Sequence, residues 1–190
     1  MTQLGIVHQG CQDYATALSY YTRALEKQKS LPQTSQVAKA SNLVGIANAY
    51  WGQKNFTEAL HYAQQALTIN ESIEGDNDAN IAKNLAILAN IHHHAGNTQT
   101  ALKISLRAIA LIERSTPLDT NSLAILINNA AGIQVSEGLY NDARLSLERA
   151  LEICKKSLPE GHPKRVILER NIQRITAMEQ QNAEKSEIGS

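Results

Sequence analysis

Apolar and small residues recur along this chain with one fixed period. A first series, at intervals of 42 residues, is Ala17, Ala59, Ala101 and Ala143. A second series with the same interval is Ala24, Ala66, Ala108 and Ala150. A third is Leu25, Leu67, Ile109 and Leu151. Three aligned series over four copies indicate an internal repeat, which is typical of solenoid arrays whose units pack on their neighbours.

Each copy is predicted to contain two helices. In the stretch 35–51, Leu43, Ile46 and Tyr50 lie three and four residues apart, which places them on one face of a helix. The following stretch 55–70, NFTEALHYAQQALTIN, is amphipathic and rich in alanine. Alanine suits the crossing of two helices, because its methyl group lets the backbones approach closely.

Capping residues and turn residues divide the chain into units. The repeats are predicted at approximately 1–30, 35–73, 78–114 and 120–157, with a final helix at 163–180 and a polar tail at 181–190. The array over 1–180 is expected to be a single domain. Short polar side chains that accept from free N–H groups are the expected helix caps: Asp13, Ser35, Asn55, Asp78, Asn97 and either Asp119 or Thr120. Leu139 breaks this rule in the fourth copy.

Glycine and proline mark the expected breaks between helices. Gly52, Gly96 and Gly138 are predicted to turn the chain between the two helices of a unit. Pro32, Gly75 and Pro117 are expected in the connectors between units.

Composition restricts the classes of partner. Lys plus Arg and Asp plus Glu number 18 each, so the chain lacks the basic excess expected of proteins that bind nucleic acid or anionic membranes. No apolar run approaches the roughly 20 residues of a membrane helix. Cys11 and Cys154 lie near opposite ends and form no C-x-x-C pair, which favours a reducing, cytoplasmic setting.

Several motifs resemble a known repeat family. The small-residue and aromatic signature is present in Leu4-Gly5 with His8, Ile46-Ala47 with Tyr50, Leu88-Ala89 with His92 and Ala130-Ala131 with Gln134. It continues with Tyr14, Phe56 and Tyr140, whereas Thr98 replaces the aromatic residue in the third copy. The segment SLPEGHPKRV at 157–166 and the pairs Asn42-Leu43 and Asn84-Leu85 are also present. Together these residues resemble the tetratricopeptide repeats, in the longer form found in kinesin light chains.

The resemblance implies an all-α fold: a right-handed superhelical solenoid of antiparallel helix pairs, with about four repeats plus a C-terminal helix. It also implies a concave groove that is lined by the first helix of each pair and binds a peptide segment. Asn48 and Asn90 are 42 residues apart, as are Trp51 and His93. Further groove candidates on first helices are Lys83, Asn128, Asn129, Arg170 and Asn171. Asparagine can donate to and accept from any peptide backbone, and Trp51 would be the apolar anchor.

Alternative interpretations of these residues remain open. The asparagines can equally solvate a helix face or bond between neighbouring helices, and Trp51 can be packing at the rim beside Tyr50. The basic clamp that some groove variants use for a carboxylate is missing, since its positions hold Ile125 and Asn129 or Ile167 and Asn171. Lys83 and Arg170, with Arg174, leave a mildly acidic peptide as a candidate ligand.

Metal and catalytic functions are not expected. The run His92-His93-His94 lacks the spacing of three or four residues that helical metal ligands favour, and no set of cysteines or carboxylates completes it. The chain has no G-x-S-x-G motif and no glycine-rich phosphate loop. We therefore expect no enzyme activity, cofactor or metal.

Two functional classes follow. The first is a protein-interaction scaffold that binds a partner's peptide in its groove. The second is an accessory or self-association region of a larger enzyme or signalling protein, which stacks through the apolar ends of the array.

Overall fold

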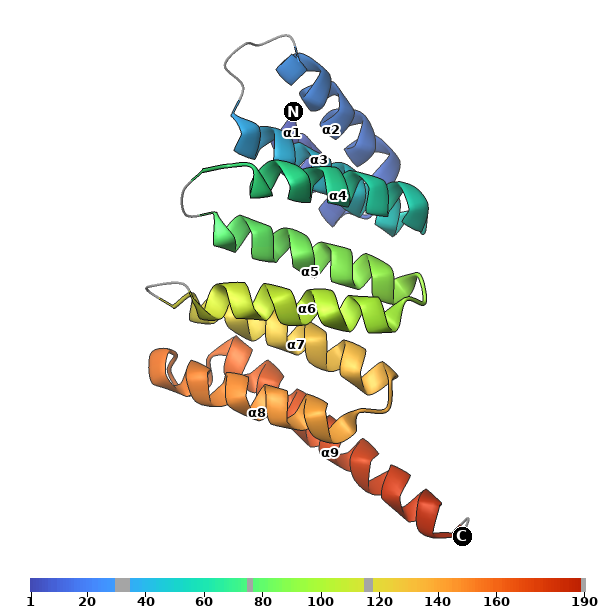
Figure 1. Ribbon diagram of the computed structural model, residues 1–190, viewed down its shortest axis with the longest axis vertical. Helices are drawn as coiled ribbons and strands as arrows, with labels where there is room; N and C mark the ends of the chain where they lie inside the picture. Colours follow the sequence, from blue (N-terminus) through green and yellow to red (C-terminus); the bar gives the residue numbers. More distant parts are fainter. Residues whose placement is uncertain (30–34, 75–76, 115–117, 189–190) are drawn as a thin grey trace. The chain divides into compact units, whose positions relative to one another are not determined.

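The computed structural model describes residues 1–29, 35–74, 77–114 and 118–188, and these ranges contain helices and turns but no strand (Figure 1). The first four helices are α1 (Thr2–Gly10), α2 (Tyr14–Lys29), α3 (Gln36–Gly52) and α4 (Phe56–Glu71). The others are α5 (Asp78–His94), α6 (Thr98–Glu113), α7 (Thr120–Ser136), α8 (Tyr140–Ser157) and α9 (Pro163–Ile188). The expected breaks at Pro32, Gly75 and Pro117 lie outside the described residues.

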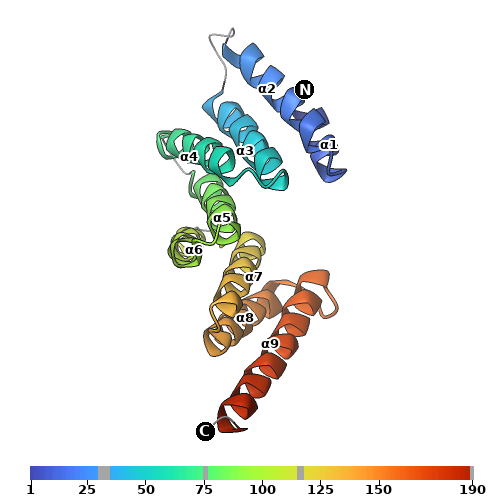
Figure 2. The same cartoon turned by 90° about the vertical axis from the view of Figure 1, so that its right-hand side faces the viewer.

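The chain forms two compact units, Met1–Ile104 and Ser105–Ser190, whose boundary falls within α6. In the first unit each helix from α1 to α4 contacts the next one along the chain, and α3 also contacts α1 and α5. In the second unit α8 contacts both α7 and α9, and α7 also contacts α9 (Figure 2). Consecutive antiparallel helices therefore pack as the periodicity predicted.

The alanine series forms the centre of the helix packing. The four residues of the first series, Ala17, Ala59, Ala101 and Ala143, are all 0% exposed. The second series is also buried. Leu43 and Ile46 of the predicted stripe are buried between the helices, whereas Tyr50 is half-buried and stacks on Tyr62 of α4. Both alanine series are therefore buried, as expected of residues between packed helices.

The turn inside each pair has the same hydrogen bond in all four copies. The backbone N–H of Asn55 donates to the carbonyl of Tyr50 at 2.9 Å. The equivalent bonds join Asp13 to His8, Asn97 to His92 and Leu139 to Gln134. This six-to-one hydrogen bond runs from a backbone N–H to the carbonyl five residues earlier. It requires the residue just before the donor to adopt the left-handed backbone conformation, with positive φ.

The left-handed residue differs from the prediction in the second copy, and no turn residue was predicted in the first. Gly96 and Gly138 have φ of 83° and 74°, as expected of turn glycines, and the equivalent positions hold Gln12 and Lys54, both at φ 60°. Gly52 is instead the last residue of α3. A Cβ on Gly52 would lie 2.4 Å from the Tyr14 ring, so this glycine serves packing and the prediction that it turns the chain was wrong.

Helix capping follows the prediction at some helices. Oxygen atoms of Asp13, Asn55 and Asp119 accept from the backbone N–H groups of Thr16, Glu58 and Ser122. Ser35 precedes α3 but makes no capping bond, and Leu139 precedes α8 without one, as expected.

The predicted cap Asp78 is wrong, because α5 already begins at Asp78 and its N-cap position is Asn77. Asn77 makes no capping bond either. Its side chain donates to the Asn70 carbonyl at 2.6 Å and accepts from Asn80 at 2.7 Å. These bonds tie the end of α4 to the start of α5.

The last helix is longer than predicted. It was expected to end near residue 180, yet α9 continues to Ile188. The residues after 180 include Gln, Ala, Glu and Lys, which favour helix, and the first glycine is Gly189. High polarity was therefore a poor guide to the helix end.

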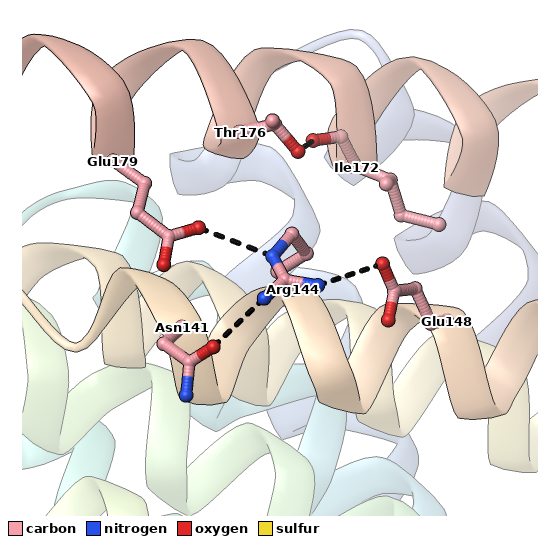
Figure 3. Close-up of polar contacts among 6 residues, drawn as sticks. All are labelled: Asn141, Arg144, Glu148, Ile172, Thr176 and Glu179. Atoms are coloured by element: carbon pink, nitrogen blue, oxygen red, sulfur yellow. Dashed lines mark hydrogen bonds and ion pairs between the residues drawn. The ribbon is translucent and has the colours of Figure 1, made fainter.

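Arg144 joins α9 to α8. Its guanidinium donates to Glu179 of α9 at 3.1 Å, to Glu148 at 3.0 Å and to Asn141 at 2.8 Å (Figure 3). The bond to Glu148, followed by the bond to Glu179, raises the pKa of Arg144 above its ordinary value. This network holds the second half of α9 against α8.

Candidate functional site

Two of the predicted groove residues lie in one pocket of the first unit. Asn48 and Trp51, one helical turn apart on α3, line a cavity of about 620 Å³. The other lining residues come from the starts and ends of the neighbouring helices: Gln9, Tyr14, Gly52, Lys54, Phe56 and His94. The pocket thus combines three aromatic rings and an imidazole with two amides and one ammonium group.

The repeat geometry positions the walls of this pocket. Tyr14 and Phe56 are the equivalent first residues of α2 and α4, so both rings lie beside the turns. Gly52 lets the Tyr14 ring approach the end of α3, as described above. Lys54 lies at the left-handed turn position, which places its exposed side chain on the pocket edge.

The triple histidine contributes to this pocket through its last member. The ring of His94 lies 5.4 Å from the ring of Trp51, measured between centroids. His93, the residue 42 positions after Trp51, contacts His94 at 5.3 Å and does not line the pocket. Trp51 therefore meets the ring one residue further along α5, because side chains of neighbouring helices interdigitate rather than meet at the same register.

The predicted asparagines fall into two groups. Asn48, Asn90 and Asn129 are half-buried, and their side-chain amides make no hydrogen bond to another described residue. Asn171 instead donates to the Asn128 side-chain oxygen at 2.7 Å, which links α9 to α7. Asn48, Asn90 and Asn129 can therefore still form hydrogen bonds with a ligand. Asn128 and Asn171 instead form a bond between neighbouring helices, which was the alternative interpretation.

The two basic candidates are exposed. Lys83 on α5 and Arg170 on α9 form no ion pair with any residue that the structure describes. Their charges are therefore solvated rather than neutralised by the fold, and each belongs to a separate unit.

His92 takes the interior position expected from the repeat. It is half-buried on α5 and, with Leu88, borders a second cavity of about 590 Å³ against α4. Burial lowers the pKa of the His92 imidazole below its ordinary value. Within the described ranges no group of three or more His, Cys, Asp or Glu side chains is arranged to hold a metal ion.

The cysteines differ in environment. Cys154 is buried in α8, and burial raises the pKa of its thiol. Cys11 is exposed after α1, and both are free. None of the described helices combines the length and apolar character needed to cross a membrane.

Sequence reasoning found Asn48 and Trp51 but missed the rest of the pocket. Tyr14 and Phe56 were recognised as repeat signature residues, and their shared 42-residue spacing was the available signal. Gln9 is the residue equivalent to Trp51 in the first copy, so the same spacing pointed to it. The contribution of His94 depends on how α3 and α5 pack, which spacing within one helix does not report.

Solved structures share this fold. BtubC (BKLC) from P. vanneervenii is 22% identical with a TM-score of 0.77, over 96% of this chain and 73% of that chain. A Podosopora anserina protein named as a kinesin light chain, with nearly identical TPR-like repeats, is 18% identical with a TM-score of 0.78, over 98% and 88%. A Rap protein complexed with competence and sporulation factor is 19% identical with a TM-score of 0.73, over 98% of this chain and 50% of that one.

Family comparison agrees with the structural likeness. No match to this sequence was found among curated proteins. The family model described as Tetratricopeptide repeat matches three overlapping segments, residues 1–72, 37–114 and 78–156. This fold is typical of protein-interaction scaffolds, and the repeat family is generally non-catalytic. The chain belongs to the tetratricopeptide repeat family.

Proposed function

We propose that this chain is a protein-interaction scaffold that binds a peptide segment of a partner protein along its first helices. The observation that carries the proposal is the pocket where the Asn48 amide, which has no described hydrogen-bond partner, lies beside Trp51. An aromatic wall next to a free amide suits a peptide, because the ring anchors a side chain while the amide bonds the backbone.

A second free amide belongs to the proposed binding surface of the first unit. Asn90 on α5 is half-buried and uncommitted in the same way as Asn48. Half-buried amides are partly desolvated before binding, so a hydrogen bond to a ligand replaces few bonds to water. The Rap protein complexed with competence and sporulation factor is a precedent for ligand binding on a similar fold.

The test uses peptides selected from a random 12-residue phage library against the folded chain. Their dissociation constants are then measured by fluorescence anisotropy for the wild type and for the double variant Asn48→Ala with Asn90→Ala. Loss of two hydrogen bonds is expected to weaken binding about tenfold or more.

The matched control is Asn121→Ala, the same change at an exposed asparagine near the start of α7. It should leave the dissociation constant unchanged. Selected peptides that bind the double variant as tightly as the wild type would exclude the groove.

A second candidate function is self-association through α1. Its side chains Leu4, Ile6 and Val7 are 47%, 52% and 60% exposed, an unusual concentration of exposed apolar surface on one short helix. Sedimentation velocity over a concentration series would show a dimer, and Leu4→Ser with Val7→Ser should abolish it. A wild-type chain that stays monomeric throughout the series contradicts this candidate.

A further inference from the structure

The pocket around Trp51 concentrates aromatic residues of this chain. Trp51 is the only tryptophan and Phe56 the only phenylalanine, and both line this cavity of about 620 Å³. Tyr14 lines it as well, and the His94 ring is tilted by 46° against the Trp51 ring. Small-molecule sites commonly have volumes of about 300–1,000 Å³ and mostly aromatic or apolar walls. The cavity therefore has the size and the lining of a site for a small ligand.

The repeat itself does not require this lining. One copy later, the residues equivalent to Trp51, Lys54 and Phe56 provide neither the two rings nor the ammonium group: they are His93, Gly96 and Thr98. That copy nevertheless makes the same backbone hydrogen bond at its turn. The helix pair thus folds without the aromatic and cationic side chains, so their presence in one copy indicates a role in binding.

The charges at the pocket distinguish between two classes of ligand. Aromatic rings alone would suit a quaternary ammonium group, which binds over ring faces. Lys54, however, lines the pocket with an ammonium group, and none of the described lining residues is acidic. This lysine is exposed and forms no ion pair with a described residue. A ligand with a negative charge is therefore favoured over a cationic one.

The backbone of Lys54 adopts a conformation that favours glycine. Its φ is 60°, and the equivalent positions in the third and fourth copies are Gly96 and Gly138. Residues in such strained conformations cluster at functional sites. Lys54 thus adds a positive charge to the pocket at a conformational cost.

Two amides complete the polar lining. The Asn48 side chain is half-buried and has no described hydrogen-bond partner. The Gln9 side-chain oxygen accepts from the Tyr21 hydroxyl at 3.1 Å, which leaves the NH₂ group of Gln9 as a donor. The pocket therefore combines N–H donors and an ammonium group with aromatic rings. This combination suits a carboxylate that is attached to a ring.

We propose that this pocket binds a small aromatic carboxylate, with a ring of phenyl or indole size and an acid group on a short chain. The ring packs among the Trp51, Tyr14 and Phe56 side chains, and the carboxylate accepts from Lys54 and Asn48. The inference goes beyond the proposed function, because the ligand is a free small molecule rather than a segment of a partner protein.

The experiment uses Trp51 as the reporter, since the only tryptophan of the chain lies in the pocket and can be excited selectively. The probes are 3-phenylpropionate, its neutral amide 3-phenylpropionamide and the cation 3-phenylpropylamine, with propionate as the ligand that lacks a ring. The acid is expected to change the Trp51 fluorescence with a dissociation constant of about 0.1–1 mM. The amide and the amine should bind about fivefold more weakly, and propionate should cause no change.

The variant Lys54→Gln removes the charge and installs the residue that the first copy holds at the same φ of 60°. It is expected to weaken binding of the acid about fivefold and to leave binding of the amide unchanged. The matched control is Lys39→Gln, at an exposed lysine of α3 that does not line the pocket. It should change neither affinity. The comparison of the probes on the wild type does not depend on the folding of any variant.

The inference is overturned if the acid causes no response, if the amide or the amine binds as tightly as the acid, or if Lys54→Gln retains full affinity for the acid. Phage-selected peptides that bind when the acid does not would leave the proposed function standing alone. Binding of the acid by a chain for which no peptide can be selected would support this inference and remove the proposed function.

Discussion

At the residue scale, the residue just before the donor of each six-to-one hydrogen bond has a positive φ. Glycine adopts this conformation with less strain than other residues do. Lys54 holds φ 60°, a region where a side chain is strained. We predict that Lys54→Gly stabilises the chain by about 0.5–1 kcal/mol, because glycine enters this region without steric cost. Urea unfolding followed by circular dichroism measures the change.

Gln53 provides the control for that substitution. It is exposed in the same turn but has φ −80°, so Gln53→Gly gains nothing and should destabilise the chain. Equal effects of the two substitutions would show that the left-handed conformation of Lys54 costs no free energy.

The His92 imidazole, also at the residue scale, makes the stability of the folded chain depend on pH. Burial lowers its pKa below 6.5, whereas the unfolded chain binds a proton near that value. The stability associated with neutral His92 is therefore present above about pH 6.5 and is lost as the pH falls through the lowered folded pKa.

We predict that His92→Gln, which installs the residue found at the equivalent position 134, reduces the loss of melting temperature between pH 7.5 and 5.5. Wild type and variant should show the same pH dependence between pH 7.5 and 8.5, where histidine does not titrate. An unchanged decrease in melting temperature below pH 6.5 in the variant would assign the acid sensitivity to other groups.

At the element scale, packing between helices depends on pairs of large and small residues. Tyr21 of α2 is 2% exposed, and its ring fills the space above two glycines, Gly5 of α1 and Gly45 of α3. The residues equivalent to Tyr21 and Gly45 in the next copy are Ala63 and Ile87. The large Tyr21 of α2 is thus paired with the small Gly45 of α3. One repeat later the sizes are reversed, with the small Ala63 on α4 and the large Ile87 on α5.

We predict that Gly45→Ala destabilises the chain by about 1–2 kcal/mol, although alanine favours helix. The added Cβ would lie 2.5 Å from the Tyr21 ring, which is buried and rigid. Tyr21→Leu, the residue found at equivalent position 147, should remove most of this cost in the double variant. Additive free energies in the double-mutant cycle would exclude contact between the ring and residue 45 as the cause.

At the scale of the whole molecule, most of what the sequence predicted about the fold came from the 42-residue repeat. Four aligned copies predicted the helix pairs because equivalent residues supported the same turns, as with Gly96 and Gly138. The same alignment indicates Lys54 as the turn residue, but Gly52 was chosen from its residue type. Within the site, spacing along α3 paired Asn48 with Trp51. The contact of Trp51 with His94 depends on how two helices pack, which periodicity leaves open.

The balanced charge of the whole chain affects how copies interact. The formal net charge is 0 at pH 7, so long-range repulsion between copies is minimal there. Apolar side chains such as Leu4 and Val7 of α1 are exposed at the same time. A pH of 5.5 lies below the sequence pI of about 7.0, so each copy has a net positive charge there.

We therefore predict that weak association, measured by sedimentation velocity over a concentration series, is stronger at pH 7.5 than at pH 5.5. Circular dichroism at both pH values must show a folded chain, because neutral His92 also contributes to stability. Leu4→Ser with Val7→Ser should reduce association at pH 7.5 without changing net charge, which separates apolar contact from charge. If association instead strengthens at pH 5.5 while the chain stays folded, balanced charge is not its cause.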